Sequence, residues 1–396
     1  MNTINTLFII VASILVLIMT PGLALFYGGQ VSKRNSVNTM LTVLLPCGLS
    51  VALWLICGYS LSFSGGAHQL IGNLNHVLMR GIPLTALTGT KLPVPLFSLF
   101  QMMFAIITPA LFVGAVVGRM RFGYLVVFIT FWSLLVYYPL VHLVWGGGFL
   151  ADWGTLDFAG GTVVHINAGI TALVLASRVG ARKQPQTRHV NLAAVLLGTT
   201  LLWLGWYGFN AGSALALNNA AVIATITTTI SASLALLSWL SLEYLTTKKV
   251  TLLGACTGTV CGLVAITPAA GYVDVIGAMG IGIGASLVSF SYIRYLKSYF
   301  KIDDALDVFG CHGMSGIWGS IATGLFATRQ GLLYTGSWRQ LGIQVLATGF
   351  TIIFTWLMAL LLTKILALLI PMRVSPHTEE VGLDQSLHDE HLVNLF

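Results

Sequence analysis

Two histidines stand inside apolar segments that are long enough to cross a membrane. His165 lies in DFAGGTVVHINAG, and His312 lies in DVFGCHGMSGIWG. An ionisable side chain at the depth of a bilayer is costly, so its presence indicates a path for a substrate or a proton. Imidazole exchanges protons near neutral pH, so two imidazoles could accept and release a proton inside such a path.

An aspartate precedes each histidine, at Asp157 and at Asp307. We expect both to act as N-caps, because a carboxylate accepts hydrogen bonds from the unpaired N–H groups of a helix's first turn. For Asp157 we also expect a fixed negative charge beneath the outer mouth, which would favour a cation. For Asp307 we favour the structural role, and we interpret Asp303 and Asp304 as ordinary residues of the membrane interface.

A single buried histidine is more often hydrogen-bonded to a neighbouring helix than part of a path. Small residues around both histidines favour the path. Gly161 and Gly169 lie four residues on either side of His165, and Gly316 lies four residues after His312. We expect these glycines to clear space on the histidine faces of their helices.

The composition predicts an all-α polytopic membrane protein. The 396 residues are 56% hydrophobic and only 8% charged, with a mean hydropathy of +0.89, which leaves too little charge to cover a soluble domain. The 43 glycines suit close helix packing in lipid. The net charge of +7 does not indicate nucleic acid, because the basic residues stand between apolar runs, as membrane topology requires.

Eleven segments have the length of about 20 apolar residues that a membrane span needs. They cover residues 5–27, 37–63, 94–117, 122–145, 158–178, 190–210, 216–244, 251–269, 272–296, 308–327 and 341–370. We interpret the first as a retained span, because no positive region precedes it and no clear cleavage site follows. We therefore expect a membrane domain over residues 1–371 and a cytoplasmic tail over 372–396.

The basic residues fix the expected orientation. One set of loops, with the segment after the last span, holds fourteen of them: Lys33, Arg34, Arg119, Arg121, Arg178, Arg182, Lys183, Arg188, Lys248, Lys249, Arg294, Lys297, Lys301 and Arg373. The other set holds Arg80, Lys91, Arg329 and Arg339. The positive-inside rule therefore puts the N-terminus outside and the C-terminus in the cytoplasm.

Eleven spans can divide into two five-span halves and a final helix. Because five is odd, the two halves would have opposite orientations, as in transporters with inverted repeats. The two histidine segments are the fifth and tenth spans, so they occupy corresponding places. They enter from opposite faces, and contact between the histidines would require the two spans to cross at mid-membrane.

Aromatic residues gather toward the outer ends of several spans. Many of them fit an aromatic belt at the membrane interface. Phe100 and Phe104 of the third span share one helix face and lie deeper than such a belt. Aromatic faces attract small cations. A hydroxyl just past the sixth span could add an acceptor. The residues concerned are Phe100, Phe104, Trp145, Trp206, Phe209 and Ser213.

The five cysteines lie within apolar segments and lack Cys-x-x-Cys spacing. We interpret them as inert buried thiols, and we expect no disulfide, metal site or cofactor.

Taken together, the sequence resembles the ammonium transporter family (the Amt/Mep/Rh superfamily), and its bacterial branch most. The resemblance rests on stretches spread through eight of the eleven spans. They are PGLALFYGG (21–29), FQMMFA (100–105), WGGGFLADWGTLDFAGGTVVHINAG (145–169), GWYGFNAGSA (205–214), LLGACTG (252–258), TPAAGYV (267–273) and DDALDVFGCHGMSGIWG (303–319).

The resemblance implies a homotrimer in the inner (plasma) membrane with one pore per subunit. It implies an outer recruitment site at Phe104, Trp145 and Ser213, and a stacked gate of Phe104 and Phe209. Asp157 matches the family's essential aspartate. His165 and His312 match its paired pore histidines, and Trp206 would shape the vestibule.

The C-terminal tail departs from the family's pattern. Bacterial members usually carry a Gly-Leu-Asp…His-Gly-Glu stretch involved in regulation, whereas this tail reads GLDQSLHDEHLVNLF, with Asp389 in place of the glycine. The resemblance nevertheless implies a PII-type regulatory protein as a partner of the cytoplasmic face. We interpret the tail, with its five acids, as otherwise a solvated terminus.

The predicted function is transport of ammonium, ammonia or methylammonium. Ammonium would be recruited at the outer aromatic site and deprotonated, and ammonia would cross an apolar pore, with or without coupled proton transfer. An ammonium sensor without significant flux would share the whole pore and stays an alternative. A hydrolytic membrane enzyme with an Asp–His pair is disfavoured, since no nucleophile motif or third metal ligand is apparent.

Overall fold

The computed structural model describes residues 1–65, 70–183 and 191–391. Within these ranges the chain is helical, and its only β-pairing is two isolated bridges. Nine of the described helices are long and apolar enough to cross a membrane. A polytopic helical membrane protein is therefore confirmed, and the exact count of eleven crossings stays a prediction.

The nine candidate spans follow the predicted segments. They are Thr3–Gly28, Lys33–Phe63, Val94–Val116, Phe122–Asp152, Gly161–Val179, Leu192–Gly212, Asn219–Thr247, Val275–Phe300 and Arg339–Leu369. The two remaining predicted segments are also helical. One is the 15-residue α11 (Leu252–Ile266), and the other joins a π-helical stretch, η8 (Phe309–Met314), to α14 (Ser315–Phe326).

Several spans are interrupted or followed by short elements. The bounds of the helices used below are α1 (Thr3–Gly28), α2 (Ser36–Leu53), α4 (Val94–Val113), α5 (Phe122–Trp132), α6 (Tyr138–Trp145), η6 (Gly161–Ile166), α8 (Asn167–Val179), α9 (Leu192–Gly212), η7 (Tyr292–Leu296), α13 (Lys297–Phe300), α16 (Arg339–Leu369), α17 (Pro376–Val381) and η9 (Asp384–His388).

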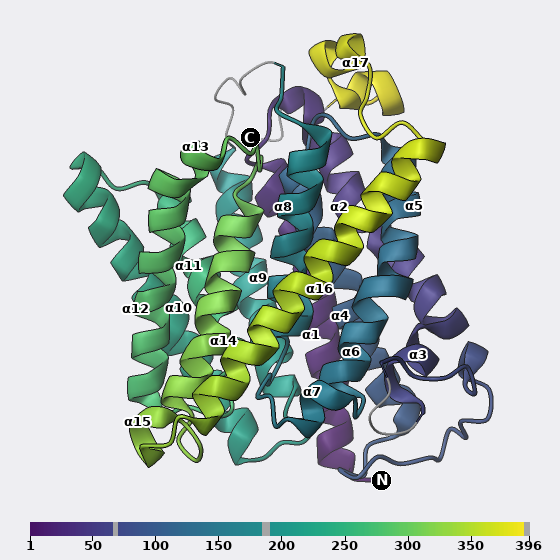
Figure 1. Ribbon diagram of the computed structural model, residues 1–396, viewed down its shortest axis with the longest axis vertical. Coiled ribbons are helices and arrows are strands. Elements are labelled where there is room, and N and C mark those ends of the chain that lie inside the picture. The colour runs from purple at the N-terminus through teal and green to yellow at the C-terminus, as the bar shows by residue number, and fades with distance from the viewer. Residues whose placement is uncertain (66–69, 184–190, 392–396) are drawn as a thin grey trace.

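The long helices run side by side, and α16 slants across the face of the bundle seen in Figure 1. The N-terminus and α17 lie at opposite ends, as an odd number of crossings requires (Figure 1). We call the end that carries α17 the tail face. The opposite end, where Trp145 ends α6, is the cup face.

Glycines allow α1 to pack closely along α9. A Cβ on Gly198 would lie 2.4 Å from the backbone nitrogen of Phe26, and one on Gly22 would lie 2.9 Å from the Cβ of Leu201. No larger residue fits at these points without moving a helix. This is the close packing through small residues that membrane helices use in place of a hydrophobic driving force.

The C-terminal tail is docked on the bundle, so its interpretation as a solvated terminus was wrong. Asp384 is only 1% exposed. Its carboxylate oxygens accept hydrogen bonds from the backbone N–H groups of Asn38 at 2.7 Å and Val37 at 3.0 Å. These are unpaired donors at the start of α2, whose N-cap residue Asn35 supplies no side-chain cap. An acid that is distant in sequence therefore does the work of a local cap.

Glu379, a second acid of the tail, also bonds to other parts of the chain. Glu379 is buried and forms an ion pair with Arg373 at 2.8 Å. The same carboxylate accepts the backbone N–H of Lys183 at 2.8 Å. Leu383 is fully buried, so polar and apolar contacts together hold α17 and η9 against the tail face.

Candidate functional site

The aromatic residues predicted on the cup face form one continuous cluster. The ring of Phe104 lies 5.1 Å from Phe100, 5.8 Å from Trp145 and 4.4 Å from Phe209, measured between centroids. Phe104 and Phe209 are tilted by 43° and are not parallel. Phe100 is fully buried and packs behind Phe104, whereas Trp145 is half-buried at the mouth of the cluster.

Ser213 joins this cluster through the end of α9. It is the C-cap residue of that helix and is half-buried. Its hydroxyl donates to the carbonyl oxygen of Phe209 at 2.8 Å. Because that bond uses the hydroxyl hydrogen, the lone pairs of the Ser213 oxygen are left to accept a hydrogen bond from a donor such as ammonium.

Asp157 caps the helical segment that carries His165. Its carboxylate accepts the backbone N–H groups of Gly160 at 2.8 Å, Gly161 at 2.6 Å and Thr162 at 2.8 Å, together with the Thr162 hydroxyl. Both oxygens are committed, and the residue is 5% exposed. Gly160 has φ +122, a conformation that favours glycine and lets the chain turn back onto the carboxylate.

The two histidines meet directly. Their Nδ1 atoms lie 3.3 Å apart, and the rings are inclined by 22° with centroids 5.3 Å apart. Both residues are buried, with exposures of 1% for His165 and 3% for His312. If the pair is hydrogen-bonded, one Nδ1 carries the hydrogen and the other accepts it, so the two imidazoles hold opposite tautomers.

Two of the three predicted glycines permit this meeting, whereas the third, Gly161, packs against Pro268. A Cβ on Gly169 would lie 2.4 Å from the backbone of Gly313, and one on Gly316 would lie 3.2 Å from the Cβ of His165. Each histidine also lies in a π-helical stretch, η6 or η8. Such stretches are rare in helices and occur often at functional sites.

Trp206 and Phe209 lie against the face of His165. The ring of Trp206 is inclined by 19° to the imidazole at 5.4 Å, and that of Phe209 by 24° at 5.9 Å. The indole N–H of Trp206 donates to the hydroxyl of Thr267 at 2.9 Å. Thr267 orients this wall of the site and was not predicted, although it stands in the quoted stretch TPAAGYV.

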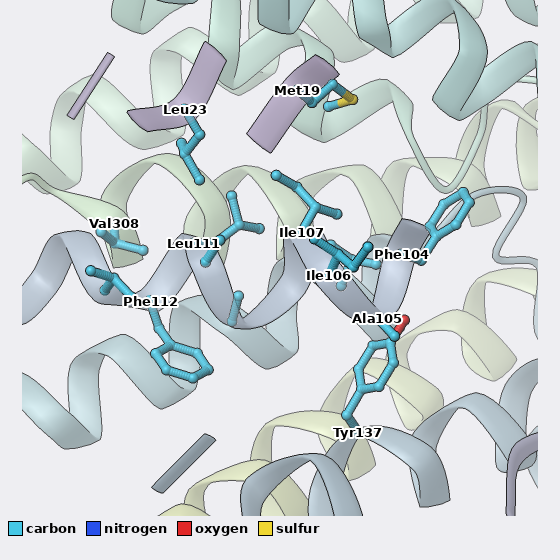
Figure 2. Packing of buried hydrophobic residues seen from close by; sticks show 14 of the residues in the cluster. Met19, Leu23, Phe104, Ala105, Ile106, Ile107, Leu111, Phe112, Tyr137 and Val308 are labelled. Carbon is cyan, nitrogen blue, oxygen red and sulfur yellow. The ribbon is translucent and has the colours of Figure 1, made fainter. Parts of the chain in front are cut away.

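A small apolar cavity adjoins the pair. Its volume is about 10 Å³, close to the minimum that holds one water molecule. Apart from the two imidazoles and the indole of Trp206, its walls are hydrocarbon, thioether or phenyl groups. They are Met19, Leu23, Phe26, Ile107, Leu111, Val164, Leu202, Phe209 and Val260. Figure 2 shows the part of this wall where Met19 and Leu23 of α1 face Ile107 and Leu111 of α4.

The acids before His312 differ from the prediction. Asp304 caps this segment and Asp307 does not: the Oδ2 atom of Asp304 accepts the backbone N–H of Phe309 at 2.7 Å. Asp307 has φ +55 and pairs with Lys297. The matching spacing was overlooked, because Asp304 stands eight residues before His312, just as Asp157 stands eight before His165.

Asp303 and Asp304 are therefore not ordinary interfacial residues. Asp304 is 1% exposed. Asp303 forms an ion pair with Arg182 at 2.7 Å and also accepts that residue's backbone N–H at 2.8 Å. Although partial burial opposes it, this hydrogen bonding lowers the pKa of Asp303 to about 2. The pair fastens the loop after α8 to the loop before η8.

Comparison with known proteins decides the family. The profile described as Ammonium Transporter Family matches residues 7–392. The chain belongs to the ammonium transporter family. An ammonium transporter of Bacillus subtilis is 42% identical over 98% of this chain and 97% of its own, and one of Aquifex aeolicus is 45% identical over 100% and 94%.

Solved structures of the family share the fold. Mep2 of Candida albicans is 32% identical and superposes with a TM-score of 0.89 over 95% of this chain and 87% of its own. A protein described as a sensor Amt protein is 28% identical, with a TM-score of 0.90 over 97% of this chain and 98% of its own.

Proposed function

We propose that this member of the ammonium transporter family carries ammonium nitrogen across the membrane by separating ammonium into ammonia and a proton. The observation that carries the proposal is the histidine pair, which places proton-exchanging nitrogens in the wall of an otherwise apolar cavity. Relatives that match almost the whole chain are named ammonium transporters, which supports the substrate.

Recruitment would take place at the cup face. The exposed side of Trp145 offers a π face, and Ser213 offers an oxygen acceptor, so together they can replace part of the water around ammonium. Asp157 adds a buried negative charge on the inner side of this site. All the residues predicted for recruitment and gating belong to this part of the molecule.

Deprotonation follows from the size and polarity of the cavity. An intact ammonium ion would have to shed its water among hydrocarbon walls, which costs several kcal/mol or more. Neutral ammonia is about the size of the single water molecule that the cavity can hold. The proton would pass to the histidine pair, whose two Nδ1 atoms are close enough to exchange it.

The arrangement in the membrane is part of the same proposal. We place the cup face outside and the tail face in the cytoplasm of a cell's inner membrane, with eleven crossings, because the tail face gathers the basic loops. The membrane domain is residues 1–371 and the tail is 372–396. A homotrimer and a PII-type partner at the tail face follow from the family resemblance.

A sensor is the second candidate function, favoured by the likeness to the sensor Amt protein. Purified protein in liposomes separates the two candidates. A transporter moves labelled methylammonium and gives a saturable response to ammonium. A protein that binds methylammonium but moves no more of it than empty liposomes do is a sensor. The transport proposal is then rejected.

A further inference from the structure

Only one of the two carboxylate oxygens of Asp304 accepts a hydrogen bond within the described part of the chain. Its Oδ2 atom accepts the N–H of Phe309, but its Oδ1 atom has no hydrogen-bond partner within the described part of the chain, although it is fully buried. A buried carboxylate oxygen without a partner is costly, and the cost falls if the group takes up a proton.

Asp157 occupies the corresponding place before the other histidine but differs in this respect. Both of its oxygens accept hydrogen bonds, from several backbone N–H groups and one hydroxyl. Such bonding stabilises a carboxylate anion. The two halves of the chain therefore share the spacing of aspartate and histidine, but only Asp304 keeps a buried oxygen without a hydrogen-bond partner among the described residues.

The surroundings of Asp304 also favour proton uptake near neutral pH. Burial is the larger effect and the negative charge of Asp307 the second, and together they raise the pKa of Asp304 to about 6, although Lys297 and backbone N–H groups oppose the rise. The ammonium group of Lys297 bonds to the carboxylate of Asp307 and the backbone carbonyl of Asp304. It makes no hydrogen bond to the Asp304 carboxylate.

Titratable or charged groups from several elements lie near Asp304. Those that act on its charge or are acted on by it are Tyr27 of α1, Arg119 before α5, Tyr292 of η7, Lys297 of α13, Asp307 before η8 and Cys311 of η8.

Residues near Asp304 adjoin the wall of the histidine cavity. Leu111 lines that cavity, and its carbonyl oxygen accepts the hydroxyl of Tyr27 at 2.9 Å. Tyr27 lies near enough to Asp304 for the charge of that carboxylate to act on its phenol. Cys311, which also interacts with Asp304, directly precedes His312. Asp304 thus caps the start of the helical stretch that carries His312 and adjoins Asp303, which pairs with Arg182 of the loop after α8.

We propose that Asp304 takes up the proton from the histidine pair and releases it at the tail face. The inference rests on the proposed function. Ammonium gives its proton to the imidazole pair and continues as ammonia. The imidazolium passes that proton to Oδ1 of Asp304, which becomes a neutral carboxylic acid. The acid then gives the proton to cytoplasmic water, where ammonia can recover it.

The decisive variant is Asp304→Asn, compared with Asp304→Glu and Asp307→Asn. An asparagine can still accept the Phe309 N–H through its amide oxygen but cannot carry a proton. We expect the ammonium-evoked current in proteoliposomes to fall at least about tenfold in Asp304→Asn, with assembly and methylammonium binding unchanged. Asp304→Glu restores a titratable group and should recover part of the current.

The pH profile separates proton handling from a purely structural role. Acceptance requires the carboxylate form, so at equal pH on both sides the wild-type current should fall as the pH drops through about 6. Asp307→Asn removes the charge that helps to raise the pKa of Asp304, so its half-point should move to lower pH.

The outcomes are distinct. A folded Asp304→Asn variant with wild-type current overturns the inference. An Asp307→Asn variant whose pH profile coincides with that of the wild type also overturns the inference. This second test remains informative if Asp304→Asn does not fold. A wild-type protein without flux or current would instead reject the proposed function.

Discussion

The indole nitrogen of Trp145 donates a hydrogen bond to the backbone carbonyl oxygen of Asp157 at 2.9 Å. The half-buried ring at the mouth of the cup is thereby fastened to the residue whose carboxylate caps the His165 segment. Trp145 also meets Phe104 nearly edge-on, at 80°. Its position is therefore fixed on two sides, and a substitution there tests both the ring and its hydrogen bond.

Trp145→Leu removes the π face and the hydrogen bond, whereas Trp145→Phe keeps a ring and loses only the bond. The cation–π term of ~0.5–2 kcal/mol corresponds to an apparent affinity for methylammonium weaker by about 2- to 30-fold in the leucine variant. The phenylalanine variant should fall between it and the wild type. Concentration-dependent uptake of labelled methylammonium measures both.

Trp338→Leu is a suitable control, because that side chain is exposed and belongs to the N-cap residue of α16, outside the cluster. Equal affinity and selectivity in Trp145→Leu and the wild type would argue against the cup as the recruitment site.

Asp157 combines a structural and an electrostatic role that two variants separate. Asp157→Asn keeps an oxygen acceptor for the N–H groups of Gly160 and Gly161, and asparagine is a good N-cap. Asp157→Ala loses the cap, at a cost of ~1 kcal/mol in stability, and the charge. If the charge favours the cation, both variants lose transport while the asparagine variant melts close to the wild type. If Asp157→Asn keeps transport and Asp157→Ala loses it, the role of Asp157 is structural and its charge is not needed.

The docked tail makes a prediction about Asp384. Asp384→Ala removes the acceptor for two N–H groups of α2, and a loss of ~1 kcal/mol is expected for such a cap. The tail should then detach more often, so hydrogen exchange of residues 376–391 should quicken. Asp389→Ala is the matched control, since Asp389 is an exposed acid of the same segment. Equal exchange in both variants would mean that Asp384 does not hold the tail.

The same docking bears on regulation. Deleting residues 379–396 removes Glu379 and Asp384 together, and we expect assembly to persist while regulation changes. A pull-down from nitrogen-replete cells compares recovery of a PII-type protein with and without the tail. Equal recovery would show that the tail is not needed for that partner.

The sequence was sufficient to place the histidines but not the groups that act through distant contacts. Span length, glycine spacing and the rarity of charge placed His165 and His312 in two membrane helices, because these are local properties. Their 3.3 Å approach depends on how the two helices cross, which local patterns do not encode. The sequence also did not predict the π-helical stretches that carry the two histidines.

Acids were the least predictable residues. Asp384 caps α2 across nearly the whole length of the chain, and no local pattern marks such a contact. Asp304 was detectable, since its distance to His312 equals that from Asp157 to His165. Asp307 stands only five residues before His312, so it does not take the place on the helix that Asp157 has before His165.

The histidine pair carries the proposed mechanism, and three variants test it. His165→Ala and His312→Ala each remove a proton acceptor and enlarge the cavity. Proton-handling groups contribute about 100-fold or more to reactions that need them, so ammonium-evoked current should fall at least that far. Potassium current should rise if the pair also excludes hydrated cations. His377→Ala, at an exposed histidine of the tail, is the control.

His165→Asp is the sharper probe, because it keeps a titratable group while changing its charge and its pKa. A carboxylate in place of the imidazole can still accept a proton, but it also attracts intact cations into the cavity. We therefore expect partial substrate movement with poorer selectivity for ammonium over potassium, recorded as two currents in the same proteoliposomes. Wild-type current and selectivity in both alanine variants would contradict the proton-handling role. The two histidines would then be core residues satisfied by each other.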